Sequence, residues 1–176
     1  MNLRTTEIAG VLSVALEPRE DSRGYFARIF DLAAIRERDP AFQIVQINRS
    51  LTRARGTIRG LHYQRAPRSE DKLVQCLSGA IFDVAVDLRP GSPTYRRWVG
   101  RELSAANREL LLVPKGCAHG FQTLTDDALV EYFVSDSYSP GHEGGVCWDD
   151  PAIGVAWPLE RPFTSDKDAA WPLLER

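Results

Sequence analysis

Apolar and polar residues alternate along most of this chain, which is the pattern of half-buried β-strands. In residues 80–88 (AIFDVAVDL) every second position is apolar, and Asp83 and Asp87 lie between them. The same alternation predicts strands over residues 109–114, residues 128–138 and residues 42–51, the last with Phe42, Ile44, Gln46 and Asn48 on one face. Turn-forming segments such as RPGSP, PKG, SPGHEGG and DDP separate these runs.

Helical signals are confined to two short segments. Asp31 is a candidate N-cap for a helix that ends before Pro40, and Ser165 is one for a turn or two before Pro172. Many short strands, few helices and no internal repeat predict an all-β fold, as a sandwich, jelly roll or barrel. No low-complexity linker divides the sequence, so we expect residues 1–176 to form a single domain.

Charge and composition narrow the function classes. The chain has 22 Lys and Arg against 24 Asp and Glu, a net charge of −2 and no basic block, so we expect no nucleic-acid partner. No apolar run approaches the ~18 residues of a membrane span, and the N-terminus lacks the apolar core of a signal peptide. Cys76, Cys117 and Cys147 form no CxxC pair and predict free thiols in a reducing compartment. We therefore expect a cytoplasmic protein that does not bind membranes.

The segment GTIRGLHYQ (residues 56–64) carries polar groups that a purely structural strand does not need. Arg59, His62 and Gln64 lie within six residues of one another, and an ideal strand puts Arg59 on the face opposite His62. For both side chains to meet one ligand the strand must bulge, and Gly60 between them would permit that.

Several kinds of chemistry are poorly supported. Metal-binding cupin barrels usually supply an HxH pair, whereas Gln64 stands two residues after His62, so we expect no metal. The sequence has no GxSxG elbow, no P-loop and no GxGxxG, and Cys117 two residues before His119 is not by itself a nucleophile–base pair. Acid–base chemistry remains, with His62 as a base near neutral pH. By themselves, Tyr132 fits a core or rim aromatic and Lys72 a solvated lysine.

A set of motifs in fixed order carries a resemblance to a known family. They are DSRGYF, GTIRGLHYQ, DKLVQCLSGAIFDVAVDLRPGSPTY, LSAANRELLLVPKGCAHGFQTL, VEYFVSDSYSPGHEGGVCWDDPAIGVAWP and SDKD, and together they span residues 21–168. The chain resembles the dTDP-4-dehydrorhamnose 3,5-epimerases. The resemblance implies a cupin-like β jelly roll, a homodimer, a nucleotide-diphosphate 4-keto-6-deoxyhexose substrate, and neither cofactor nor metal. Such enzymes remove the protons at C3 and C5, each α to the C4 ketone, and return them on the opposite face.

The resemblance also implies roles for individual residues. His62 would be the base, Asp168 would hydrogen-bond its other ring nitrogen, and Tyr132 would be the acid on the opposite face of the sugar. Lys72 would stabilise the enolate oxygen, with Asp83 as its supporting partner. Arg23 and Arg59 would hold the diphosphate, and Gln64 would be a supporting contact. The other implied substrate contacts are Phe26, Gln46, Asn48, His119, Tyr138, Glu143 and Lys167.

Two positions depart from the family pattern. Arg28 stands where members often have Glu, and Ile47 stands where Asp is common. Our hypothesis is that Arg28 adapts the pocket to another nucleotide or a modified sugar, and the alternative is a surface residue paired with Glu37 or Asp39. Inversion at C3 alone, another nucleotide sugar, a metal-dependent cupin and a non-catalytic sugar-nucleotide-binding cupin also stay open.

Overall fold

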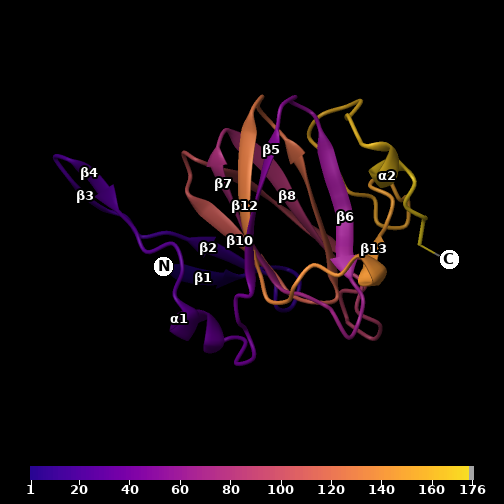
Figure 1. Cartoon of the computed structure of the whole chain (residues 1–176), viewed down its shortest axis with the longest axis horizontal. Coiled ribbons are helices and arrows are strands. Elements are labelled where there is room, and N and C mark those ends of the chain that lie inside the picture. Colours follow the sequence, from indigo (N-terminus) through magenta and orange to yellow (C-terminus); the bar gives the residue numbers. More distant parts are fainter. Residues whose placement is uncertain (175–176) are drawn as a thin grey trace.

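Two antiparallel β-sheets face each other in the computed structural model, which describes residues 1–174 (Figure 1). The six-stranded sheet runs in the order β1 (Asn2–Thr5), β2 (Leu12–Ala15), β10 (Glu109–Val113), β7 (Lys72–Ser78), β12 (Ala128–Val134), β5 (Gln46–Thr52). The five-stranded sheet runs in the order β13 (Glu143–Gly145), β6 (Ile58–Gln64), β11 (Cys117–Thr123), β8 (Ala80–Asp87), β9 (Trp98–Ser104). This two-sheet arrangement confirms the predicted all-β jelly roll.

Most predicted strands are present, but β5 starts later than predicted. The alternating pattern placed Phe42 and Ile44 on one strand face with Gln46 and Asn48, and this was wrong. Phe42 and Ile44 precede the strand and pack with Ile35 over the outer face of the six-stranded sheet. The register with β12 begins at Gln46, and Gln46 and Asn48 line the larger cavity between the sheets.

Both predicted helix caps are confirmed. The Asp31 carboxylate accepts hydrogen bonds from the amides of Ala33 and Ala34 at the start of α1 (Leu32–Arg36). The Ser165 hydroxyl accepts one from the amide of Asp168 in α2 (Asp166–Ala169). A 3-10 turn, η1 (Pro140–His142), precedes β13. No helix within residues 1–174 is long and apolar enough to cross a membrane.

The apolar core fills only part of the space between the sheets. Its residues come from both sheets, with Val74 and Val130 on one side and Ile81 and Leu103 on the other. On β12 the inward positions then change from Val130 to Tyr132, and on β7 they change from Val74 to Lys72 (the first residue of that strand). The same jelly roll is therefore apolar at one end and polar at the other, and the polar end holds the cavities described below.

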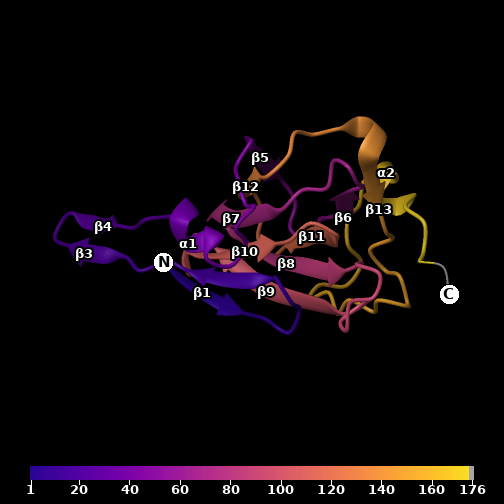
Figure 2. The ribbon, with the colours of Figure 1, turned by 90° about the horizontal axis from the view of Figure 1, so that it is seen from below.

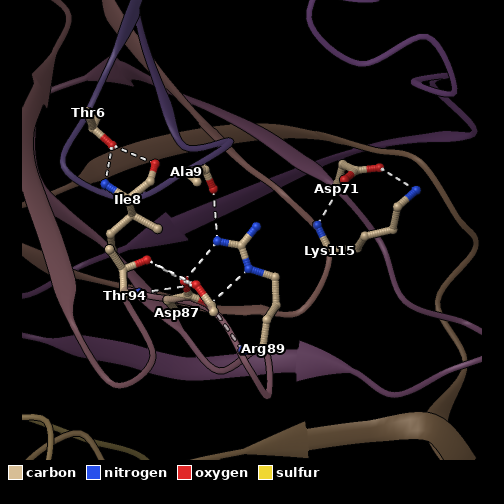
Figure 3. A network of polar contacts seen from close by, with 9 residues as sticks. Thr6, Ile8, Ala9, Asp71, Asp87, Arg89, Thr94 and Lys115 are labelled. Carbon is tan, nitrogen blue, oxygen red and sulfur yellow. Dashed lines mark hydrogen bonds and ion pairs between the residues drawn. The ribbon is translucent and has the colours of Figure 1, made fainter.

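A buried carboxylate ties the loop after β8 to the N-terminal segment (Figure 3). Asp87 accepts hydrogen bonds from the Arg89 guanidinium and from the hydroxyls of Ser92 and Thr94, at 2.5 to 2.8 Å. Arg89 continues to the carbonyl of Ala9 at 2.8 Å. Burial opposes ionisation, but these bonds hold the pKa of Asp87 well below its usual range. The network therefore fixes the loop geometry through a carboxylate that is ionised near neutral pH.

A two-stranded hairpin stands apart from the sheets. It consists of β3 (Arg19–Asp21) and β4 (Gly24–Phe26). Figures 1 and 2 show it projecting from the end of the molecule opposite β6, β13 and α2. The Phe26 residue is 70% exposed. At the base of the hairpin, the Arg108 guanidinium lies 4.0 Å from the centre of the Tyr25 ring.

Candidate active site

Two adjoining cavities lie between the sheets at their polar end. The larger has a volume of about 470 Å³ and the smaller about 290 Å³. Both are lined by His62, Lys72 and Tyr132, so these three side chains lie where the cavities meet. His62 comes from the five-stranded sheet, whereas Lys72 and Tyr132 come from the six-stranded sheet. Groups far apart in sequence thus face one space from two walls.

The histidine on β6 forms a dyad with an aspartate on α2. His62 Nε2 lies 2.6 Å from Asp168 Oδ1, and the Gly60 amide donates to Asp168 Oδ2 at 3.4 Å. Burial works to raise the pKa of Asp168, but the hydrogen bond and charge of His62 outweigh it and lower that pKa. An ionised Asp168 accepts a hydrogen bond from Nε2–H, which leaves Nδ1 as the basic nitrogen of the neutral ring.

The predicted bulge next to His62 is confirmed. His119 on β11 pairs with His62 on β6, and Phe121 pairs with Arg59. The paired residues are two positions apart on β11 and three positions apart on β6, so β6 carries one extra residue. Gly60 has φ +141°, and a Cβ there would lie 2.6 Å from the Cα of Gly120. Only glycine fits this contact and this conformation. Because of the bulge, Arg59 and His62 line the same smaller cavity.

Tyr132 and Lys72 face His62 from the opposite sheet. Burial, followed by the negative charge of Glu70, raises the pKa of Tyr132, while Arg59 works to lower it. The Tyr132 hydroxyl therefore stays protonated and can give up its proton as an acid. Lys72 is only 13% exposed at its side chain, and its Nζ lies 3.2 Å from Glu70 Oε1.

A second imidazole–carboxylate pair lies behind the smaller cavity. His119 Nε2 lies 2.8 Å from Asp83 Oδ1, and Asp83 is fully buried. The predicted partner of Lys72 was Asp83, but Lys72 pairs with Glu70 at 3.2 Å and the Asp83 carboxylate contacts His119 at 2.8 Å instead.

Five of the predicted substrate contacts gather around the larger cavity. Gln46, Asn48, Tyr138 and Glu143 line it directly. Gln46 Oε1 accepts a hydrogen bond from the Tyr138 amide at 2.7 Å, and the Tyr138 hydroxyl donates to Glu143 at 3.2 Å. Lys167, which lines the smaller cavity, donates to both oxygens of Glu143 at 2.7 and 2.8 Å. These contacts link β5, β13 and α2 at one rim.

Arg59 and Gln64 are held by neighbouring groups. Arg59 Nε donates to Thr52 Oγ1 at 2.9 Å, which fixes the guanidinium beside β5. Gln64 Oε1 accepts from the Ser139 amide at 2.6 Å, and its Nε2 lies 2.8 Å from the carbonyl of Arg68. Gln64 therefore supports the loops on both sides of the larger cavity, in addition to lining it.

Three predicted binding residues do not line either of the two cavities described above. Arg23 and Phe26 belong to the projecting hairpin region, and Arg23 pairs with Asp21 at 2.6 Å. Arg28 pairs with Asp31 at 3.0 Å, so the alternative partners Glu37 and Asp39 were wrong. Ile47 is 57% exposed, outside the cavities.

Sequence reasoning missed several residues in and around the site, of which Glu70, Ser50 and Trp171 are instructive. Glu70 lines the larger cavity, and its spacing of two from Lys72 was a usable signal because residues i and i+2 of an extended chain share a face. Ser50 lines the smaller cavity by the same alternation from Asn48. The rings of Trp171 and His62 form a T-shaped pair with their centroids 6.1 Å apart, and no local pattern predicted that contact.

Metal ligands do not cluster in the part of the chain that the structure describes. Within residues 1–174, no three His, Cys, Asp or Glu side chains come together as candidate ligands. His62 and Tyr132 are side chains that can accept and donate a proton, and both line the cavities beside the cation of Lys72.

Comparisons with known proteins agree on one family. The family described as dTDP-4-dehydrorhamnose 3,5-epimerase matches residues 5–176. A protein of that name from Sinorhizobium fredii is 45% identical over 175 residues, covering 99% of this chain and 90% of the relative. The Bacillus anthracis epimerase crystallised with TDP and pyrophosphate superposes with a TM-score of 0.94 at 41% identity, covering 98% and 99% of the two chains. The Legionella pneumophila enzyme in complex with dTDP-4-keto-L-rhamnose superposes with a TM-score of 0.91 at 39% identity, covering 98% and 92%.

Proposed function

Because this chain belongs to the dTDP-4-dehydrorhamnose 3,5-epimerase family, we propose that its two cavities invert C3 and C5 of dTDP-4-dehydro-6-deoxy-D-glucose by proton transfer alone. The chain is an isomerase with the cupin-like jelly roll of that family. The observation that carries the mechanism is the placement of His62 and Tyr132 on opposite walls of one space. We further propose that residues 1–176 act as one domain with one catalytic centre.

His62 takes the proton from the substrate. A C–H bond α to a ketone is only weakly acidic, so the base must be oriented and its charged form stabilised. The 2.6 Å contact with Asp168 does both, because it holds the tautomer with a basic Nδ1 and stabilises the imidazolium that forms. The C–H electron pair moves toward the carbonyl and leaves an enolate with its charge on O4.

Lys72 opposes the charge on that oxygen. An ammonium aimed at a developing oxyanion is most effective where water is excluded, and Lys72 is largely buried. His119, held by Asp83 at 2.8 Å, provides a second polar contact from the other wall.

Tyr132 returns a proton on the face opposite His62. Inversion needs a donor and an acceptor on different faces of the ring, and the two sheets supply one each. After proton return, His62 is protonated and Tyr132 is ionised, so solvent exchange must reset both before the second carbon reacts. The same pair serves C3 and C5 when the sugar ring presents each carbon in turn.

The nucleotide diphosphate occupies the rim. Arg59 is suited to phosphate oxygens because its guanidinium is planar and permanently charged. Gln46, Asn48, Tyr138, Glu143 and Lys167 are proposed to contact the substrate around the same cavities.

We also propose a homodimer, in which the hairpin of one chain reaches the cavity of the other. This would bring Arg23, Phe26 and Arg28 to a substrate, which their position in a single chain does not. Exposed Ile47 and Leu51 on edge strand β5 favour such contact. Sedimentation equilibrium is expected to give twice the chain mass, and Ile47→Glu is expected to weaken the association.

Proton NMR in deuterated buffer tests the proposed reaction. The purified protein is expected to introduce deuterium at both C3 and C5 of dTDP-4-keto-6-deoxyglucose, and His62→Ala is expected to introduce none. Deuterium at C3 alone would identify a C3 epimerase. No exchange by the unmodified protein at either carbon would refute the proposal for this substrate.

A further inference from the structure

Glu70 is a carboxylate inside the cavity with no role in the mechanism above. It stands two residues before the first residue of β7, and it lines the larger cavity beside Lys72 and Tyr132. Its side chain is only 10% exposed. A largely buried carboxylate is costly unless it is paired, so its partners indicate what it does.

Both carboxylate oxygens of Glu70 are engaged. Oε1 lies 3.2 Å from Lys72 Nζ, and Oε2 lies 3.2 Å from Gln64 Nε2. Gln64 is itself fixed by the Ser139 amide at 2.6 Å and lies 3.3 Å from the carbonyl of Ser137. Glu70 is therefore held by Gln64 on β6 as well as by Lys72, and Gln64 is in turn held by the loop before η1.

This geometry gives Glu70 two effects on the reacting groups. The first is steric and electrostatic, since a fixed anion restricts a flexible ammonium to one place. The second is on Tyr132, whose pKa burial and the charge of Glu70 both raise. The other titratable and charged groups that line the two cavities are Arg59, His62, Tyr63, His119, Tyr138, Glu143, Lys167 and Asp168. Among these, Arg59 works against Glu70 and lowers the pKa of Tyr132.

We propose that Glu70 is a positioning residue for the epimerase reaction, which holds the Lys72 ammonium at the enolate oxygen and places its own negative charge in the cavity that Tyr132 lines. This inference rests on the proposed function. In this proposal the Glu70 carboxylate acts on Lys72 and Tyr132 and does not act on the base, His62.

Glu70→Gln tests the assignment because it keeps the shape and removes the charge. We expect kcat to fall about tenfold with a smaller change in KM, since Lys72 acts mainly on the charge that develops in the transition state. We expect the alkaline limb of the kcat profile to move down by about half a pH unit or more, because Tyr132 loses a neighbouring anion. Glu70→Asp keeps the charge, so its alkaline limb should stay near that of the unmodified protein while kcat remains reduced.

A spectroscopic titration separates this inference from the proposed function. Tyrosinate absorbance followed against pH is expected to show one tyrosine ionising at lower pH in Glu70→Gln, and Tyr132→Phe is expected to remove that component. The exposed Glu160→Gln is the matched control and should leave both profiles unchanged. An unshifted tyrosine in a folded Glu70→Gln protein, or an unmoved alkaline limb, would overturn the inference. If the tyrosine ionises at lower pH in Glu70→Gln but the unmodified protein does not exchange the C3 or C5 protons, the proposed reaction is refuted and the inference about the position of Glu70 is not.

Discussion

Replacing Asp168 by Asn is a sharp test of the proposed base, because the surroundings dictate how the new amide is oriented. Asp168 Oδ2 accepts from the Gly60 amide at 3.4 Å, while Oδ1 faces His62 Nε2 at 2.6 Å. The amide oxygen of Asn is needed at Gly60, so its NH₂ group faces His62. An NH₂ donor beside Nε2 favours the tautomer with the proton on Nδ1, which removes the basic nitrogen from the substrate side.

The expected fall in kcat of Asp168→Asn has two causes. A hydrogen bond to a charged group contributes about 1.5–3 kcal/mol, and about 1.4 kcal/mol corresponds to tenfold in rate, so losing imidazolium stabilisation lowers kcat by about 10- to 150-fold. The unfavourable tautomer adds to this. Together they predict a fall in kcat of about 10²- to 10⁴-fold with little change in KM.

The assay is the rate of C3 and C5 deuterium incorporation at saturating substrate, with thermal melting to confirm folding. Asp166→Asn is a matched control, since Asp166 lies on the same short helix but is exposed and makes no contact with His62 among the hydrogen bonds described. We expect the control to stay within about twofold of the unmodified protein. A folded Asp168→Asn protein that keeps kcat within threefold would show that the dyad does not set the basicity of His62.

Three further predictions concern the acid, the fold and the specificity. Tyr132→Phe should slow complete inversion by about 10²- to 10⁴-fold while deuterium exchange at C3 falls less than tenfold, because His62 still removes the proton; equal losses would contradict the assignment. Asp87→Asn should lower the free energy of unfolding in urea by about 3 kcal/mol near neutral pH. Because the pKa of Asp87 is lowered in the fold, this stabilisation is present above the ordinary carboxyl pKa of about 4 and is lost as pH falls, so an undiminished difference in acid would refute it. Arg28→Glu should change the preference among dTDP, UDP, CDP and GDP sugars in competition assays, and an unchanged preference would make Arg28 only the partner of Asp31.

Local patterns in the sequence predict much of this fold. Alternation located β8, β10 and β12, and capping chemistry located α1 and α2, because each depends on neighbours within a few residues. The same alternation failed over residues 42–45, where it continues past the end of the strand. There the apolar residues pack against α1, and a period of two does not distinguish that surface from the inside of the barrel.

The candidate site likewise contains residues that sequence motifs predicted and residues whose location depends on the three-dimensional fold. Family motifs identified His62, Tyr132, Lys72 and Asp168, and the structure brings all four to the same pair of cavities. The partner of Lys72 was predicted wrongly because the family resemblance directed attention to Asp83, while the spacing of Glu70 two residues before Lys72 was not used. The location of Arg23 and Phe26 was likewise beyond sequence reasoning, since the direction of a hairpin depends on how the chain leaves the sheet.

The contact between Gly60 and Gly120 limits how this site can be redesigned. A side chain at Gly60 would meet the backbone of Gly120 at 2.6 Å, and a side chain at Gly120 would meet Gly60 at 2.9 Å and the carbonyl of Arg59 at 2.8 Å. No single substitution at either glycine is expected to be neutral, because the added Cβ would meet main-chain atoms that no side-chain rotamer can move aside. Variant libraries that aim at new sugars should therefore keep both glycines fixed and place their diversity at the rim.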